Sequence, residues 1–392
     1  MTGQRRDKGD GSIYQRKSDG KWIAKYTHTK GVKPKVIYGK TESEAKKKLR
    51  EYKKEIAKNG YVEIQKGTVK SYMEKWFNEI KVNELKPKSL DALDSTLRNQ
   101  VYPHIGDIQL STITSKDVQA MLNELAQQRT PRDKPLAYST IKKAYMAVNA
   151  CFKHAVIHED TVKNPCLGVK LPKNVNQKRE EVKFFTQEQV ANICRECVAK
   201  HSNDKQVYRL GQAIIVLVYT GMRIGELLGL KWADIDYDKR TGKVYDSVVM
   251  VKDRARNDGD ATPKYKLLEQ TSVKTSSSSR IVTLNQKAIS ALQEIQLING
   301  EYPHVMANSK GKIIIPRNFD RMLRNVLERC GIEPSGAHTL RHTYASMLFK
   351  NRVDVKTVSE LLGHKDVAFT YNTYIHLIKE QKQQAVDILD TL

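Results

Sequence analysis

The sequence predicts a multidomain α+β protein: a small three-stranded sheet with one helix, then a helical bundle, then a mainly α domain with a small antiparallel β-sheet or hairpin. Three observations support this prediction. The chain has 392 residues, which exceeds the usual size of one hydrophobic core. Strand-like runs occur at residues 13–38 and 244–284, whereas apolar residues at helical spacing mark most of the remainder. We therefore expect the sheets to be local features of a largely helical chain.

The first predicted domain, residues 1–62, contains three short strands and a helix. The strands are expected at residues 13–17, 22–26 and 36–38, with turns between them. A helix should begin near Glu42 and stop at Asn59-Gly60, because apolar residues recur at helical spacing between these points. The strand and turn positions carry a basic cluster that could lie on DNA: Arg16, Lys17, Lys21, Lys25, Lys33 and Lys35. For any single one of these residues, a solvated charged surface is the simpler interpretation.

The second predicted domain, residues 66–169, is a compact bundle of helices. Helical patterns begin near Thr68, Ser115 and Ser139, with prolines between them. We expect the aromatic face of the first pattern to be buried core and not a platform for stacking bases. Residues 170–184 then form an extended basic linker, because they contain an early proline and show no apolar periodicity.

The third predicted domain, residues 185–392, is mainly helical. An apolar helix is expected up to Tyr219, and further helical patterns run from about residue 287 to the C-terminus. Strand-like runs at residues 244–251 and 280–284 enclose a polar stretch. We therefore expect a β-sheet with a long hairpin in the middle of this domain.

The composition favours a polyanionic partner. The chain has 68 Lys and Arg against 44 Asp and Glu, a formal net charge of +24. No apolar run approaches the roughly 18 residues of a membrane span, and no apolar segment follows the N-terminus, so we expect a cytoplasmic protein without membrane contact. Cys194 and Cys197 form a lone C-x-x-C in a helical pattern, for which reduced packing is a better interpretation than zinc binding.

Four short segments carry arginine, histidine and tyrosine in chain order. They are T-G-M-R-I-G-E at 220–226, H-T-L-R-H at 338–342, L-L-G-H at 361–364 and Y-I-H at 374–376. His338 and Arg341 fall on one face of a helix, because they are three residues apart. Judged alone, each has an ordinary explanation as a surface ion pair, a structural histidine or a packed tyrosine. Together, on a basic chain, they indicate chemistry on a DNA phosphodiester.

With these segments the chain resembles the tyrosine recombinase, or phage integrase, family, in particular integrases of Gram-positive conjugative transposons and temperate phages. The resemblance covers nearly the whole chain, as an arm-type DNA-binding domain, a core-binding SAM-like domain and a catalytic domain. It implies a site-specific recombinase that cleaves and rejoins DNA through a 3′-phosphotyrosyl link and a Holliday junction, to integrate and excise a mobile element. It implies no metal and no ATP, and the sequence shows no acidic cluster spaced for Mg²⁺.

The resemblance also implies a role for each site residue. The guanidinium groups of Arg223 and Arg341 would hold the non-bridging phosphate oxygens, and His364 would add a hydrogen bond. Tyr374 would be the nucleophile, with His338 as its base or proton relay. These assignments account for all four segments.

Two further residues complete the implied site. Lys274 would protonate the leaving 5′-oxygen, and Glu226 would orient Arg223. Tyr371 stays an alternative nucleophile, although Tyr374 matches the family's Y-x-H ending. The alternative lysines are Lys264 and Lys266, since all three lie in or beside the predicted hairpin, whose loop from Asp253 to Thr271 looks longer than the family's usual turn.

The partners implied by the resemblance are double-stranded DNA with core and arm attachment sites, three further copies of the chain in a tetramer, and an excisionase or DNA-bending protein. The tail after Ile378 is helical in pattern and would pack on a neighbouring protomer, or on its own domain. Three other functions stay open: a type IB topoisomerase-like nicking and religating enzyme, a catalytically inactive DNA-binding factor, and a chromosome-dimer resolving recombinase. The last class lacks the arm-type module expected before about residue 60.

Overall fold

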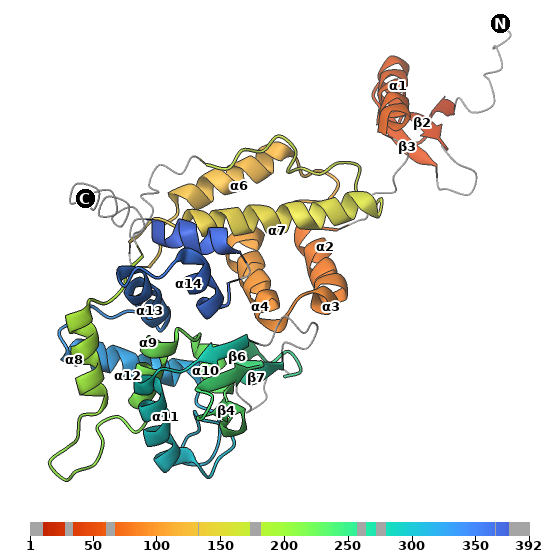
Figure 1. Ribbon diagram of the computed structural model, residues 1–392. Coiled ribbons are helices and arrows are strands. Elements are labelled where there is room, and N and C mark those ends of the chain that lie inside the picture. Colours follow the sequence, from red (N-terminus) through yellow and green to blue (C-terminus); the bar gives the residue numbers. More distant parts are fainter. Residues whose placement is uncertain are drawn as a thin grey trace, which may run out of the picture. The chain divides into compact units, whose positions relative to one another are not determined.

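The computed structural model describes residues 11–27, 34–59, 67–131, 133–172, 182–256, 264–271, 280–364 and 366–375. The chain divides into two compact units, Met1–Val175 and Asn176–Leu392. Figure 1 shows the elements of both units, which are described one at a time below. None of the helices in the described ranges combines the length and the apolar character that a membrane span requires.

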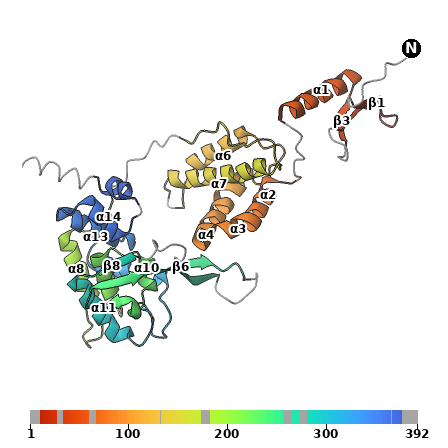
Figure 2. The same ribbon diagram turned by 45° about the vertical axis from the view of Figure 1, so that its right-hand side comes forward.

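The N-terminal sheet is antiparallel, in the order β1-β2-β3. Its strands are β1 (Ser12–Gln15), β2 (Trp22–Tyr26) and β3 (Lys35–Gly39), and α1 (Glu42–Asn59) lies beside them (Figure 2). A small core joins helix and sheet through Ala24, Ala45 and Leu49. The helix approaches the third strand so closely that a Cβ on Gly39 would lie 2.6 Å from the backbone nitrogen of Ala45. The predicted three strands and helix are confirmed.

The next part of this unit is helical. Its α-helices are α2 (Val69–Trp76), α3 (Val82–Glu84), α4 (Pro87–Thr96), α5 (Tyr102–Ile105), α6 (Ser115–Gln127) and α7 (Tyr138–Ile157). Two π-helical turns, Phe77–Lys81 and Leu97–Val101, connect α2 to α3 and α4 to α5. The aromatic face of α2 is buried through Tyr72 and Trp76, which confirms its interpretation as core.

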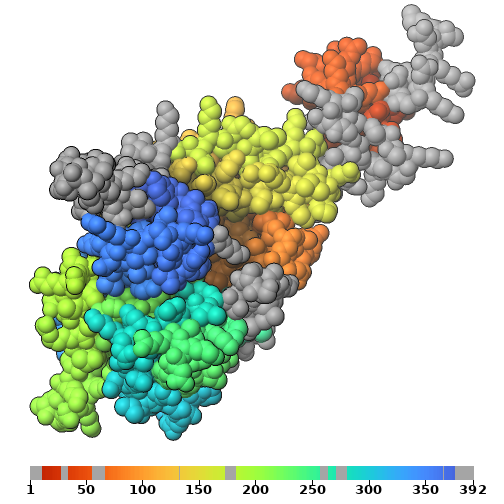
Figure 3. Space-filling view, in the orientation of Figure 1, coloured from red at the N-terminus to blue at the C-terminus, as the bar shows by residue number. Residues whose placement is uncertain are grey.

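The C-terminal unit has a helical core. Its helices are α8 (Gln187–Cys197), α9 (Gln212–Thr220), α10 (Ile224–Gly229), α11 (Gln286–Asn299), α12 (Pro316–Arg329), α13 (His338–Lys350) and α14 (Val355–Leu362), and residues 367–375 are also helical. The apolar helix α9 is almost wholly buried among the others. In Figure 3 the blue surface of the C-terminal helices adjoins the yellow-green surface that begins at α8. Cys197 is part of this core, as its packing interpretation predicts.

The β-structure of this unit differs from the prediction. The expected strand at residues 244–251 is two strands that belong to two sheets, because the chain leaves the sheet at Tyr245. β5 (Thr241–Val244) lies between β4 (Ile235–Asp236) and β8 (Arg280–Thr283), whereas β6 (Asp246–Lys252) pairs with β7 (Tyr265–Thr271).

The predicted long loop from Asp253 to Thr271 is therefore wrong. Its last seven residues are β7, in register with β6 so that Leu267 faces Met250. The two adjacent leucines, with polar residues on both sides, conceal the two-residue alternation that normally marks a strand. The turn of this hairpin is correspondingly shorter than expected. Lys274 lies outside the described residues.

Candidate active site

Two glycines with left-handed backbone conformations shape the site. Gly221 ends α9 with φ 63°, and Gly363 ends α14 with φ 64°. A Cβ on Gly221 would lie 2.4 Å from Cδ1 of Tyr344, and a Cβ on Gly363 would lie 2.6 Å from Cδ of Arg280. Both turns thus require glycine for conformation and for space. The two turns place the residues that follow them, Arg223 and His364, near Arg341 at the start of α13.

Arg341 joins these two turns. Its side chain is buried, and its Nη1 donates to the carbonyl oxygen of Gly221 at 2.7 Å while its Nη2 donates to that of Leu362 at 2.5 Å. Burial, and then the nearby positive charge of Arg223, lower the pKa of Arg341 to about 10. The guanidinium therefore stays positive at neutral pH. At most three of its five N–H groups remain for a ligand.

Glu226 is held between two arginines. Nη1 of Arg223 donates to Oε1 at 2.8 Å, and the backbone N–H of Arg223 donates to Oε2 at 2.8 Å. Nη2 of Arg280 donates to Oε2 at 2.7 Å. Burial by itself would raise the pKa of Glu226, but Arg280 and Arg223 outweigh it and hold this pKa below its usual value. The carboxylate thus orients Arg223, whose own side chain is 45% exposed and open to a ligand.

Arg280 was not among the site residues predicted from the sequence. Besides Glu226, it binds the carbonyl oxygen of Leu361 through Nη1 at 2.8 Å, two residues before Gly363. It begins β8, at the end of the serine run, and a lone arginine at the start of a short strand gives no periodic or spacing signal that would single it out.

The Tyr374 hydroxyl lies 2.7 Å from Nδ1 of His342. The tyrosine is only 1% exposed, and its ring also packs on Phe349, with 5.4 Å between ring centroids. Burial raises the pKa of Tyr374 well above its usual value. Burial, together with His338 and Arg341, lowers the pKa of His342 to about 4. Tyr374 is thus protonated and His342 neutral at pH 7.

His342 was also missed as a site residue. It ends the H-T-L-R-H segment one helical turn after His338, and that spacing places both imidazoles on one face of a helix. In the structure their ring centroids are 4.7 Å apart, edge to face. The four-residue spacing between His338 and His342 could therefore have identified His342 as a site residue, but the family motif names only His338 and Arg341 in this segment.

The two predicted site histidines, His338 and His364, both lie near Arg341. His364 directs Nδ1 to the hydroxyl of Thr370, 2.7 Å away, and its ring meets Phe369 edge to face. Burial, and then Arg341, lower the pKa of His364 to about 4. Burial, and then Arg341 and Arg223, also lower the pKa of His338. Both imidazoles are therefore neutral hydrogen-bonding groups beside the arginines at pH 7.

The lysine of the predicted site is not defined by the described residues. Of the two alternatives, Lys266 lies in β7 and its Nζ binds Oδ1 of Asp253 at 2.9 Å. Lys264 accepts, through its backbone carbonyl, a hydrogen bond from the backbone N–H of Asp253 at 2.9 Å. Both lysines thus flank the turn of the β6–β7 hairpin.

The basic residues of the N-terminal sheet do not share one face. Ala24 faces α1, so its neighbour Lys25 points to the opposite side, where its Nζ lies 5.5 Å from the ring centroid of Tyr14. Lys35 instead lies over the ring of Tyr52 in α1. Of the remaining basic residues, Arg16 and Lys21 bind Asp19 and Lys17 is exposed. Lys33 lies outside the described residues.

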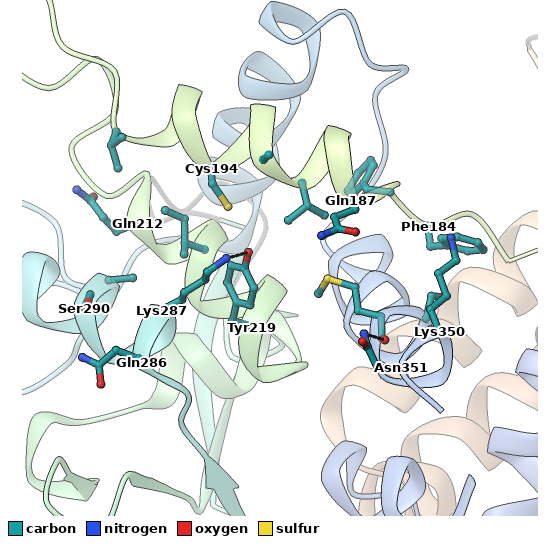
Figure 4. A pocket seen from close by; sticks show the side chains of 18 of the residues that line it. Phe184, Gln187, Cys194, Gln212, Tyr219, Gln286, Lys287, Ser290, Lys350 and Asn351 are labelled. Carbon is teal, nitrogen blue, oxygen red and sulfur yellow. Dashed lines mark hydrogen bonds between the residues drawn. The ribbon is translucent and has the colours of Figure 1, made fainter. Parts of the chain in front are cut away.

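A separate cavity of about 720 Å³ lies between α8, α9, α11 and α13 (Figure 4). Lys287 points into it and donates to the Tyr219 hydroxyl at 3.1 Å, close to Cys194. The described residues that line it include none of the predicted catalytic residues. Nowhere in the described ranges do three or more His, Cys, Asp or Glu side chains group in a way that could hold a metal ion.

Comparison with known proteins gives matches over both units. The model of the phage integrase family matches residues 183–381, and that of the phage integrase N-terminal SAM-like domain matches residues 68–126. A protein named tyrosine recombinase XerC-like from Caldanaerobacter subterraneus subsp. tengcongensis is 32% identical over 376 residues, which are 91% of this chain and 92% of that protein.

Two solved structures have a similar fold. The Tn1549 transposon integrase in complex with transposon right end DNA has a TM-score of 0.64 at 19% identity, over 81% of this chain and 99% of that one. The lambda integrase tetramer bound to a Holliday junction has a TM-score of 0.54 at 17% identity, over 94% of this chain and 96% of that one.

Proposed function

This chain belongs to the phage integrase family of tyrosine recombinases, which are DNA strand-exchange enzymes, and we propose that it integrates and excises a mobile DNA element. The similarity to a transposon integrase supports this choice within the family. So does the N-terminal sheet with its helix, because a separate basic module suits the binding of accessory arm sites. The work of such an enzyme would be done in the bacterial cytoplasm, at the nucleoid.

One observation carries the proposed chemistry: the Tyr374 hydroxyl touches a neutral histidine, and Arg341 and Arg223 lie near enough to His338 and His364 to lower the pKa values of both. Arg223 presents an exposed guanidinium that Glu226 holds in place, and Arg341 supplies a buried positive charge. Both suit the negative charge that builds on the non-bridging oxygens during attack on a phosphodiester. His338 and His364 can donate hydrogen bonds to the same oxygens.

The reaction then proceeds without an external energy source. The Tyr374 hydroxyl gives its proton to a neighbouring imidazole while its oxygen forms a bond to phosphorus, and the bond from phosphorus to the 5′-oxygen breaks. Lys274 donates a proton to the leaving 5′-oxygen. The 3′-phosphotyrosyl link conserves the phosphodiester bond energy, so the 5′-hydroxyl of another strand can attack it without ATP. None of these steps uses a metal ion.

The proposed partners follow from charge and from the fold. The net charge of +24 suits extended contact with double-stranded DNA at core and arm sites, and binding should weaken steeply with salt. A lambda integrase of similar fold forms a tetramer on a Holliday junction. We infer the same assembly for this chain, with the tail after Ile378, outside the described residues, exchanged between protomers. An excisionase or a DNA-bending protein would choose the direction of the reaction.

A nicked suicide duplex that carries the element's end tests the proposal. Incubation in EDTA should give a covalent protein–DNA adduct on denaturing gels with the wild type and with Tyr371→Phe, but none with Tyr374→Phe. An adduct lost only with Tyr371→Phe would move the nucleophile by one helical turn. Relaxation of supercoiled DNA without any recombinants would favour the topoisomerase-like alternative. No wild-type adduct on a verified site would favour an inactive DNA-binding factor.

A second candidate within the family is the resolution of chromosome dimers. The 32% identity to a protein named XerC-like is the observation that favours it. The two functions differ in their target, because an integrase gene has an attachment site close by. Recombination of that flanking sequence, and not of a chromosomal terminus site, is the outcome we expect.

A further inference from the structure

The resemblance assigns the tyrosine's proton to His338, but the structure places a different histidine against the reacting oxygen. Among the described histidines, His342 brings a ring nitrogen to the Tyr374 hydroxyl, 2.7 Å away. His338 lies beyond it, with its ring against His342 and its charge environment set by Arg341 and Arg223. The order in space is therefore tyrosine, His342, His338.

The contact between Tyr374 and His342 is supported by packing on α13 and by a second contact on the tyrosine's own helix. His342 and Phe349 lie two turns apart on α13, and both touch the ring or hydroxyl of Tyr374. The helix at residues 367–375 is anchored a turn earlier, where Thr370 meets His364. These contacts on one short helix direct the Tyr374 hydroxyl at Nδ1 of His342 in the free chain.

We propose that His342 is the catalytic base for Tyr374, and that His338 is left to face the phosphate. This inference rests on the proposed function. During cleavage the Tyr374 O–H bond breaks and its proton goes to Nδ1 of His342, while the tyrosine oxygen bonds to phosphorus and the 5′-oxygen leaves with a proton from the general acid. During religation the incoming 5′-hydroxyl returns its proton to the general acid as its oxygen bonds to phosphorus, the bond from phosphorus to the tyrosine oxygen breaks, and that oxygen takes its proton back from His342.

The electrostatic surroundings fit an acceptor that works only with substrate. Burial, His338 and Arg341 keep the imidazole neutral. In the tautomer that carries its ring proton on Nε2, Nδ1 has a lone pair that can accept from the Tyr374 hydroxyl. A bound phosphate brings negative charge beside Arg341 and His338. That charge offsets the positive field that disfavours an imidazolium, and the proton affinity of His342 rises when DNA occupies the site. Without DNA, Tyr374 keeps its proton and is a weak nucleophile.

The first test is single-turnover cleavage of the suicide duplex by His342→Gln, with His338→Gln as the matched variant one turn away. Glutamine keeps a hydrogen bond to the tyrosine but cannot take its proton. We expect cleavage by His342→Gln to be slower by about 10²–10⁴-fold, the usual contribution of general acid–base catalysis. Core-DNA binding in a gel shift should equal that of the wild type, which separates this effect from misfolding.

A substrate with sulfur at the 5′-bridging position shows which proton transfer each variant lacks, the one from Tyr374 or the one to the leaving group. A thiolate leaves without a proton, so this substrate should restore cleavage by Lys274→Ala but not by His342→Gln. Full restoration of His342→Gln by the sulfur substrate would assign His342 to the leaving group and overturn the inference.

A fluorinated tyrosine at position 374 provides a readout that a purely structural role would not change. Its phenol is more acidic and needs less help from a base, so the difference between wild type and His342→Gln should narrow by tenfold or more. The inference would be overturned if fluorination left the ratio of the two cleavage rates unchanged, or if His342→Gln cleaved DNA as fast as the wild type. The proposed function would stand in either case. Absence of any adduct from the wild type would overturn both.

Discussion

Arg280 and Glu226 form an ion pair of 2.7 Å in which the two side chains are only 16% and 10% exposed. The pair connects β8, the strand that follows the segment with Lys274, to the helix that begins after Arg223. Arg280 also binds the chain just before Gly363. One guanidinium thus fixes three segments that carry site residues relative to one another.

Arg280→Gln should reduce both stability and cleavage. It leaves a largely buried carboxylate with one arginine, and breaking such a pair costs about 3 kcal/mol or more. Cleavage should fall because Glu226 then holds Arg223 less firmly. Urea unfolding and the suicide-duplex assay measure the two effects. Lys239→Gln, which breaks the exposed pair of Lys239 with Asp236, is the control and should change neither.

Gly221→Ala should be more destabilising than Gly331→Ala. Gly331 also has a positive φ, 68°, but a Cβ there meets nothing within 4 Å, so its substitution isolates the backbone cost of about 1–2 kcal/mol. At Gly221 the new methyl also overlaps the Tyr344 ring. Thermal unfolding should rank the variants in this order, and Gly221→Ala combined with Tyr344→Ala should recover part of the difference. Equal effects at the two glycines would contradict the close packing.

The free energy of unfolding should fall as the pH drops from about 6.5 to about 4. The pKa values of His342 and His364 are near 4 in the folded chain and 6.5 without its constraints, so the unfolded state binds more protons in this window. Stability is therefore fully present above pH 6.5 and declines below it. Denaturant titrations at several pH values measure the decline, which should be smaller in His342→Gln. A flat profile would show that these imidazoles are not shielded.

Lys25→Gln and Lys35→Gln should affect arm-site binding differently. Lys25 lies on the open face of the N-terminal sheet, whereas Lys35 lies over Tyr52 on the side of α1. If the open face lies on DNA, Lys25→Gln should weaken binding uniformly across sequences and lower the salt dependence by about one phosphate contact. Lys35→Gln should bind nearly as the wild type does. Fluorescence anisotropy with arm-site duplexes at several salt concentrations makes the comparison.

Removal of residues before Gly67 should abolish arm-site binding and leave some core-site cleavage. The N-terminal sheet and α1 have their own small core, around Ala24, and the helices that follow have a separate cluster of buried residues, which the truncation leaves complete. Binding to separate arm and core duplexes measures the two activities. Undiminished arm-site binding by the truncated chain would show that another part of the protein reads these sites.

The sequence was sufficient to predict elements whose apolar residues recur at a regular spacing. Apolar spacing located the long helices, including the buried α9. The sequence was insufficient wherever a contact joins distant segments. Arg280 meets Glu226 across 54 positions, and Tyr374 meets His342 across 32, and no local pattern encodes either meeting. β7 was missed because its apolar residues are adjacent rather than alternate.

Arg341 has a consequence for how the site comes into being. Its side chain donates to a carbonyl at each glycine turn, so the charge that we propose for holding the phosphate also connects the surrounding segments of the chain. Formation of the site is consequently cooperative. When either turn opens, Arg341 loses its position, and the neighbouring Arg223 and His364 lose theirs. A DNA strand-exchange enzyme built in this way is protected from premature cleavage by partly folded copies, in which the reactive groups are present but not brought together.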